Sequence, residues 1–251
     1  MFVRKVQGDE QRVEIPGYEK DGVPCPEVLL AGPEVKEYAD FLAMRLDFDH
    51  VITMCEHRAA LAKDRTISAP DQVIGMRATW EAAVIAYGRA FVGGVSAAQG
   101  GGGRTRFPES ILDRLNDDQR AVHEHTMSLR NKHVGHRVND WTQVIVTAVL
   151  NPETKGARNV LQVGNKLFTV IGGGEDAEQL RDVAVILRDG LMDRMKVIEA
   201  EIMTQLRAQP IDELYESAQA EAKRGAQLME LERQRRASAA ATQAEMAEPP
   251  E

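Results

Sequence analysis

The stretch GEDAEQLRDVAVILRDGLMDRMKVIEAEIMTQLRA, residues 174–208, decides the fold class of this chain. Its apolar residues recur every three or four positions, which is the spacing of one face of an α-helix. Gly190 weakens such a helix only slightly, and the first residue that breaks it is Pro210. We therefore predict one long helix that buries a single face against other helices. That face consists of Val183, Leu187, Leu191, Met195, Ile198, Ile202 and Leu206.

Three more long helices are expected upstream, each from a start signal that is followed by apolar residues at helical spacing. Proline or an acidic residue suits a first turn, because proline fixes the required φ angle and the helix dipole favours negative charge. Together with the last helix they predict a mainly α fold, a four-helix bundle over residues 34–208. The expected starts are Pro33 or Glu34 for a helix ending near Ala62, Ser68–Asp71 for one ending at Gly93-Gly94, and Asn116-Asp117 for the third, with a short helix at 109–115 before it.

A β-branched run, Thr142–Leu150, interrupts the helical pattern before the last helix. Two shorter apolar runs follow, Val160–Val163 and Leu167–Ile171, and Gly164-Asn165 separates them. A dipeptide of this kind between apolar runs is typical of a tight hairpin turn. We predict a small antiparallel hairpin or meander of two or three strands, inserted at about residues 142–172, that needs a helical surface to lie on.

The two ends of the chain differ from the predicted bundle. Residues 1–33 contain glycine and proline too often for a helix, so an irregular segment is expected there, with a short strand at Gln11–Ile15. Residues 210–237 show a thinner apolar stripe and predict a C-terminal helical extension. Residues 238–251 show no apolar period, and their Ala, Thr, Gln, Glu and Pro composition predicts a disordered tail.

Composition indicates a globular protein of the cytoplasm. Hydrophobic residues make up 43% of the chain and charged residues 28%. The two cysteines, Cys25 and Cys55, predict free thiols rather than a disulfide framework or a metal site. No signal peptide and no membrane-spanning run is predicted. The net charge of −8 means that any contact with phosphate must be local.

One stretch brings unlike functional groups together: Leu129-Arg130-Asn131-Lys132-His133-Val134-Gly135-His136, on the third long helix. Arginine offers a planar charged donor for a phosphate oxygen, and histidine can transfer a proton near neutral pH. Asn131 can orient a partner group or a ribose hydroxyl. Every charged residue between Ser128 and Asn139 is basic. These residues are Arg130, Lys132 and Arg137. They form a positive spot on a negative chain.

This string, followed by Arg137-Val138-Asn139, resembles the signature of the HEPN superfamily (higher eukaryotes and prokaryotes nucleotide-binding). In that signature an arginine, usually followed by a polar residue such as asparagine, stands four to six residues before a histidine. A bacterial branch related to abortive-infection proteins also has an aromatic–Arg–Ala–Phe segment on the preceding helix. Tyr87-Gly88-Arg89-Ala90-Phe91 is similar to that segment. The resemblance covers residues 34–140, and covers the β insertion and last long helix more loosely.

The resemblance implies a four-helix bundle that often forms a homodimer. It also implies metal-independent endoribonuclease activity, in which a ribose 2′-OH attacks the adjacent phosphate, in antiphage defence or a toxin–antitoxin system. No cofactor and no metal is implied. The residues that match the signature are Arg130, His136 and Asn131 as catalytic candidates, and Lys132, His133, Arg137 and Arg89 as candidates for substrate binding.

Helical geometry sets a condition on this assignment. Six residues turn a straight helix by about 600° and advance it by about 9 Å, so Arg130 and His136 do not share one face. Either Gly135 loosens the end of the helix, or two protomers combine their residues, as the resemblance favours. Without the resemblance, the same residues fit a helix-end arginine and a solvated or capping histidine.

Two further functions are open on the sequence. One is a catalytically silent HEPN-like module that binds RNA, nucleotide or a protein partner, with the C-terminal helix as the partner or antitoxin site. The other is a phage-encoded structural protein. His123 and His125 lie about 200° apart on a helix, so a solvated face is expected rather than a metal site. Trp80 and Tyr87 are expected in the core.

Overall fold

The computed structural model describes residues 2–5, 11–14, 18–98, 102–131, 142–152, 160–169 and 174–247. The chain divides into two compact units. The first, called here the bundle unit, is Gly32–Ile202, and the second joins Met1–Ala31 to Met203–Glu251. Most of the described residues are helical, and the strands form small antiparallel pairs. The prediction of a mainly helical bundle with a small hairpin insertion is therefore confirmed.

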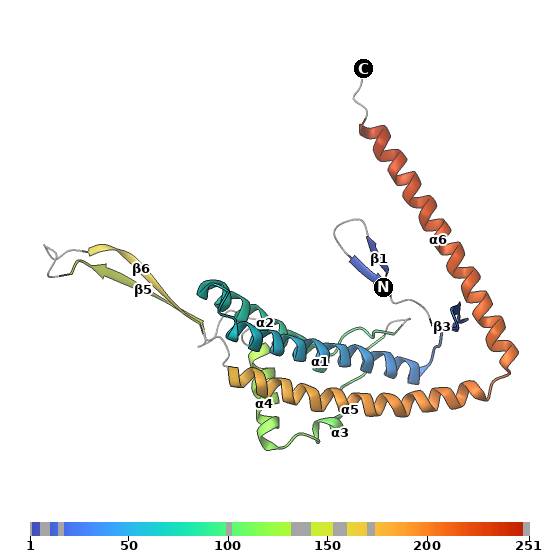
Figure 1. Ribbon diagram of the computed structural model, residues 1–251, viewed down its shortest axis with the longest axis horizontal. Coiled ribbons are helices and arrows are strands. Elements are labelled where there is room, and N and C mark those ends of the chain that lie inside the picture. The colour runs from blue at the N-terminus through green and yellow to red at the C-terminus, as the bar shows by residue number, and fades with distance from the viewer. Residues whose placement is uncertain are drawn as a thin grey trace. The chain divides into compact units, whose positions relative to one another are not determined.

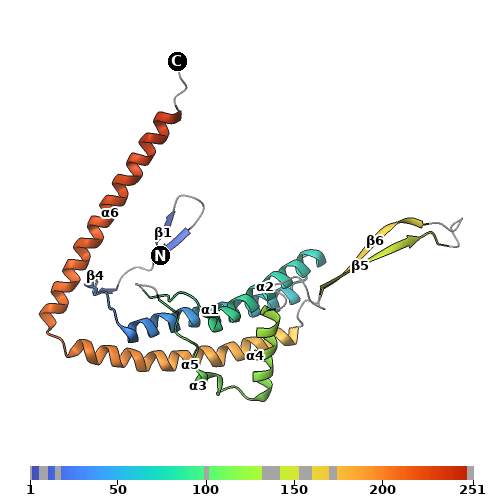
Figure 2. The same ribbon diagram turned by 180° about the vertical axis from the view of Figure 1, so that it is seen from behind.

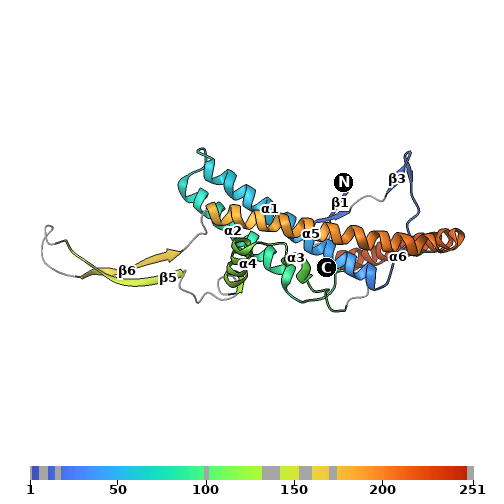
Figure 3. The same cartoon turned by 90° about the horizontal axis from the view of Figure 1, so that it is seen from below.

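The long helices of the bundle unit are α1 (Pro33–Lys63), α2 (Ala69–Phe91), α4 (Asp117–Leu129) and α5 (Gly174–Arg207). α1, α2 and α5 lie side by side, and α4 runs across them (Figure 1, Figure 2, Figure 3). The predicted helix starts agree with these bounds to within a few residues.

Local chemistry explains where these helices begin. Pro33 stands in the first turn of α1, where its missing N–H costs no hydrogen bond. The Ser68 hydroxyl accepts a hydrogen bond of 3.3 Å from the backbone N–H of Asp71 and caps α2. Asn116 and Gln119 cap α4 reciprocally, each side chain accepting from the backbone N–H of the other.

The core of the bundle unit forms where α1, α2 and α5 turn their apolar faces toward one another. The stripe predicted for α5 is buried from Val183 to Ile198, and Ile202 is half-buried. Trp80 and Tyr87 are 8% and 0% exposed, so their predicted core positions are confirmed. Each large apolar side chain contributes about 1.5–3 kcal/mol by leaving water. The largest fully buried side chains are Tyr87, Phe41, Phe48, Met44, Leu180, Leu187, Leu191 and Ile198.

A short helix, α3 (Glu109–Leu112), packs on α5 through a glycine. A Cβ atom at Gly190 would lie 2.5 Å from Cγ2 of Ile111, which is closer than real side chains approach. Gly190 therefore does more than weaken α5, because it lets Ile111 reach the core. α3 is shorter than the predicted 109–115.

A buried carboxylate ties the loop after α2 to α1. Asp40 is 0% exposed and accepts hydrogen bonds from the Ser96 hydroxyl at 2.8 Å, the Ala97 N–H at 2.8 Å and the Thr105 N–H at 2.7 Å. Nζ of Lys36 lies 3.3 Å from Oδ2 of Asp40, the oxygen that also accepts from the Thr105 N–H. Burial raises the pKa of this carboxyl, but the hydrogen bonds outweigh burial and hold the pKa well below its ordinary value.

The insertion is a two-stranded hairpin, β5 (Thr142–Leu150) and β6 (Val160–Thr169). The predicted turn at Gly164-Asn165 is wrong, because these residues lie inside β6 and pair with Thr147 and Val146. One continuous ladder along β5 outweighs the local turn preference of two residues. The predicted break between the shorter runs therefore does not occur.

The second unit contains two small strand pairs and α6 (Ile211–Ala247). β1 (Phe2–Lys5) pairs with β2 (Gln11–Glu14), and β3 (Glu19–Lys20) pairs with β4 (Val23–Pro24). The irregular segment predicted for residues 1–33 therefore holds more strand than the single one expected. Asp21 and Gly22 both have positive φ angles, which suits the two-residue turn between β3 and β4.

α6 also corrects the prediction of a disordered tail from residue 238, since the helix continues to Ala247. The tail has no apolar period, and that absence suggested disorder. Its many alanines favour a helix through backbone propensity alone, which needs no packing partner. Residues 248–251 lie outside the described residues.

Replacing Asp40 with asparagine is expected to lower the free energy of unfolding at pH 7 by about 2–3 kcal/mol, because the amide cannot satisfy the same donors. A carboxyl with a depressed pKa stabilises the fold fully above the unfolded-state pKa and loses that contribution as the pH falls. The difference in unfolding free energy between wild type and Asp40→Asn should therefore become smaller once the pH falls below 3.8, the ordinary pKa of an aspartate. Urea denaturation from pH 7 to pH 3 measures it.

The matched control is Asp49→Asn on the same helix, which removes exposed ion pairs to Arg45 and Arg188. Such pairs contribute about 0.2–1 kcal/mol each. An equal loss of stability in the two variants would contradict the anchoring role of Asp40.

Candidate functional site

The arginine of the motif lies against α2 at a glycine. Gly88 is buried, and a Cβ atom on it would lie 2.6 Å from Cγ and 3.0 Å from Cδ of Arg130. Real Cβ contacts are longer than this, so only glycine leaves room for the arginine stem at this point. The two segments that carry the family resemblance, Tyr87–Phe91 and the string that begins at Arg130, are therefore in contact.

The end of α4 holds the guanidinium group near the next residue of the motif. Nη1 of Arg130 donates a hydrogen bond of 2.9 Å to Oδ1 of Asn131. The backbone forms a π turn at these two residues, with hydrogen bonds from residue i to i+5. A straight α-helix is therefore no basis for extrapolating from Arg130 to His136. The sequence pattern predicts a regular helix at these residues and not a π turn.

The remaining motif residues are outside the part of the chain that the structure describes. They are Lys132, His133, His136 and Arg137. Their catalytic and substrate-binding roles stay predictions, as does the partnership between Arg130 and His136.

Arg89, a candidate for substrate binding, pairs with a carboxylate of α1. Its Nη2 lies 2.8 Å from Oδ1 of Asp47, and its side chain is 56% exposed. Nη2 of Arg104 lies 3.7 Å from the other oxygen of Asp47, and Nη1 of Arg104 donates to the backbone oxygen of Arg89 at 2.6 Å. The cluster joins α1, α2 and the following loop and has one more positive than negative charge. The substrate-binding role of Arg89 stays a prediction.

His123 does not lie on a solvated face as predicted. It is half-buried, and a hydrogen bond of 2.8 Å joins its Nδ1 to the hydroxyl of Tyr87. Its ring also meets Phe91 edge-on, with centroids 4.8 Å apart. Burial lowers the pKa of this histidine, so the neutral form is favoured. The signal that could have found it is its spacing of seven residues from Arg130, which places both on the side of α4 that meets α2.

Other site chemistries find little support in the described residues. No group of three or more His, Cys, Asp or Glu side chains there is arranged to hold a metal ion. Both cysteines are free thiols, and burial raises the pKa of Cys55 to about 12, which disfavours a thiolate nucleophile. No helix within the described ranges is long and apolar enough to cross a membrane.

Comparison of the chain with protein-family models, with curated proteins and with solved structures finds no match. The site is therefore defined by its own geometry, a motif arginine packed on a glycine of the neighbouring helix.

The contact between Gly88 and Arg130 predicts opposite effects of one substitution in two backgrounds. In a helix, alanine is favoured over glycine by about 1 kcal/mol. Gly88→Ala should nonetheless destabilise the wild-type protein, because its methyl group collides with the arginine stem. In Arg130→Ala protein the stem is absent, so Gly88→Ala should stabilise the fold by about 0.5–1 kcal/mol. A double-mutant cycle by chemical denaturation measures this coupling.

Arg120→Ala is the matched control background, because Arg120 lies on the same helix and pairs with Asp113 instead. Gly88→Ala should remain destabilising there. The same effect of Gly88→Ala in all three backgrounds would show that Arg130 does not pack on Gly88.

Proposed function

We propose that this chain is a HEPN-like, metal-independent endoribonuclease that acts as a homodimer. The observation that carries the proposal is the contact between Arg130 and Gly88. It joins, on neighbouring helices of a helical bundle, the two separate segments in which the sequence resembles that superfamily. If the match of the short motif were due to chance, the second segment, Tyr87–Phe91, would have no reason to lie against Arg130.

In the proposed reaction the guanidinium group of Arg130 binds a phosphate oxygen and stabilises the charge that develops at phosphorus. His136 accepts the proton of the ribose 2′-OH as that oxygen attacks phosphorus. The new bond joins O2′ to phosphorus and the bond from phosphorus to O5′ breaks. O5′ takes a proton from a water molecule, and His136 returns its proton to solvent. The products are a 2′,3′-cyclic phosphate and a 5′-hydroxyl end. No metal ion takes part.

Asn131 has a defined place in this scheme. Its carbonyl oxygen holds one arm of the guanidinium group, which restrains the Arg130 side chain before substrate arrives. Lys132, His133 and Arg137 supply the local positive charge that the overall charge of −8 does not. We propose that His136 of a second chain completes each site. The RNA contact is then small and centred on the motif.

We propose α6 as the surface for a protein partner or antitoxin in a defence or toxin–antitoxin system. Ile211, Tyr215 and Leu231 on this helix are 62%, 54% and 55% exposed. Ile211 and Tyr215 lie four residues apart and so share one face of the helix, which is the arrangement that a partner groove can receive.

Purified protein is expected to cleave single-stranded or structured RNA in the presence of EDTA. Arg130→Ala or His136→Ala should lower the cleavage rate by about 10²–10³-fold, because each removes charge stabilisation or proton transfer. Gel analysis of labelled RNA, with detection of the cyclic phosphate, measures both the rate and the chemistry.

Two control variants keep the residue type and change the position. Arg120→Ala removes an arginine of α4 that pairs with Asp113, and His57→Ala removes an exposed histidine of α1. Both should cleave like wild type. Cleavage that survives in Arg130→Ala protein would refute the assignment. RNA that stays intact but binds in an Arg130-dependent way would instead favour the silent module.

A further inference from the structure

His123 joins α4 to α2 next to the contact of the motif arginine. A hydrogen bond of 2.8 Å links its Nδ1 to the hydroxyl of Tyr87, and the following residue of α2, Gly88, is the one against which Arg130 packs. His123 and Arg130 are seven positions apart, which is about two helical turns and about 10 Å of rise, so they lie on one side of α4. Neighbouring residues of α2 therefore contact α4 at two points along that side.

Tyr87 gives this hydrogen bond a fixed partner inside the core. It is 0% exposed, and the centroid of its ring lies 5.8 Å from that of Phe48 and 5.1 Å from that of Phe91. A buried hydroxyl needs a hydrogen-bond partner, and Nδ1 of His123 supplies it. The ring of His123 also meets Phe91 edge-on. Two packed residues of α2 thus set the position of His123.

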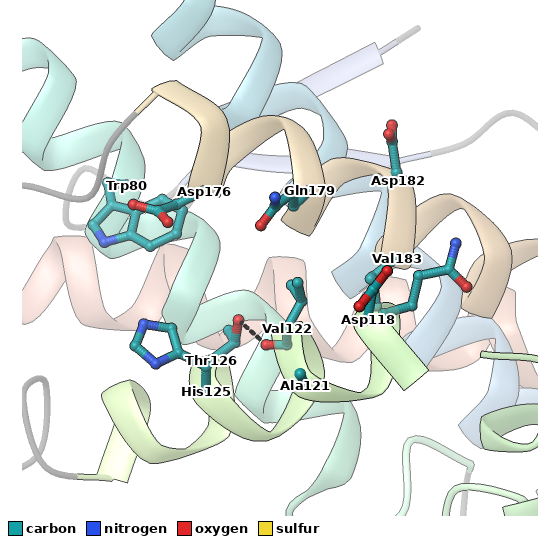
Figure 4. A pocket seen from close by; sticks show the side chains of 11 residues that line it. Trp80, Asp118, Ala121, Val122, His125, Thr126, Asp176, Gln179, Asp182 and Val183 are labelled. Carbon is teal, nitrogen blue, oxygen red and sulfur yellow. Dashed lines mark hydrogen bonds between the residues drawn. The ribbon is translucent and has the colours of Figure 1, made fainter. Parts of the chain in front are cut away.

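The other side of α4 faces open space. It borders a cleft of about 480 Å³ that α4 shares with α5, and Trp80 of α2 lines one end of this cleft (Figure 4). Asp118 and His125 are among the residues of α4 that line it. Packed contacts resist displacement and open space does not, so the orientation of α4 depends strongly on its contacts with α2.

The bond to Tyr87 adds a restraint that apolar packing lacks. Val122, Met127 and Leu129 of α4 are partly buried and pack against the core. Apolar burial is not directional, so these side chains hold α4 on the bundle but tolerate rotation about the helix axis. A hydrogen bond weakens steeply when its angle changes, and it therefore opposes that rotation.

We infer that His123 is a positioning residue, which holds α4 in the rotation that lays the stem of Arg130 against Gly88. Rotation of α4 moves Nδ1 of His123 and the stem of Arg130 away from α2 together, because both lie on the same side. The position of the guanidinium group therefore depends on the bond to Tyr87. This placement is independent of the proposed ribonuclease activity, and only its consequence for RNA cleavage rests on that function.

The chemistry of His123 suits this role better than proton transfer. Its Nδ1 is engaged by Tyr87, and the residue lies about two turns from Arg130. Burial lowers the pKa of His123 and outweighs the carboxylates of Glu124 and Glu109, which raise it. The bond therefore joins two uncharged groups, which avoids placing a charge among the aromatic rings.

The test measures the coupling between Gly88→Ala and Arg130→Ala, which is the departure of their effects on the free energy of unfolding from additivity. His123→Phe keeps an aromatic ring and removes the bond to Tyr87. In this background the coupling should fall by about half or more, because the arginine stem no longer rests against position 88. If His123 only stabilised the fold, every protein of the cycle would lose the same stability and the coupling would not change.

Three further backgrounds sharpen the result. His123→Asn keeps a hydrogen-bonding group close to the position of Nδ1 and should restore most of the coupling. Tyr87→Phe removes the same bond from the other helix, should lower the coupling as His123→Phe does, and decides the question if His123→Phe protein does not fold. His125→Phe is the matched control, because His125 lies on the cleft side of α4. It should leave the coupling unchanged.

His123→Phe should also lower the rate of RNA cleavage by about ten- to a hundredfold, because Arg130 is misplaced, while His125→Phe should cleave like wild type. An unchanged coupling in both His123→Phe and Tyr87→Phe protein would overturn the inference whatever the RNA result. So would an equal loss of coupling in His125→Phe protein. A lowered coupling in a chain that cleaves no RNA would support the positioning role of His123 and refute the proposed ribonuclease activity.

Discussion

The apolar face of α5 must be covered along most of its length in the bundle unit, and this requirement organises the elements around it. Its buried residues share one core with Phe41 and Phe48 of α1 and Tyr87 of α2, which are almost fully buried. α3 approaches through the gap that Gly190 leaves. The loop after α2 is then fastened to α1 by Asp40, whose hydrogen bonds offset the cost of burying a charge. The apolar core around α5 is thus accompanied by a specific polar contact, the hydrogen bonds of Asp40 to the loop after α2.

α4 is held differently from the other long helices. Its contacts with α2 are specific: His123 bonds to Tyr87 and meets Phe91, and Arg130 covers Gly88. Between α4 and α5, by contrast, lies the cleft that Trp80 closes at one end. The two sides of one helix therefore differ in chemistry. One side carries the arginine of the motif, packed on Gly88, and the other side lines the cleft with Asp118 and His125.

Helix positions could be predicted from the sequence because their signals are local. Caps such as Asn116 with Gln119, and the stripe along α5, depend only on residues a few positions apart. The predictions of a turn at Gly164-Asn165 and of a disordered tail were wrong for a related reason. The local turn signal was outweighed by a long strand ladder, and the missing apolar period of the tail was outweighed by the helix propensity of its alanines. The contacts of Arg130 with Gly88 and of His123 with Tyr87 join residues far apart in the sequence. Periodicity places such residues on faces of helices, but it does not show which faces meet.

The contact between Gly88 and Arg130 also couples the evolution of these two positions. Arginine at position 130 is accommodated because position 88 has no side chain, so position 88 cannot gain one at no cost while the arginine is present. A lineage that loses the arginine frees the glycine to become alanine, which then strengthens the helix. Arginine cannot return afterwards until that methyl group is lost again. Loss of this arginine would therefore tend to be irreversible, and the residue at position 88 would record it.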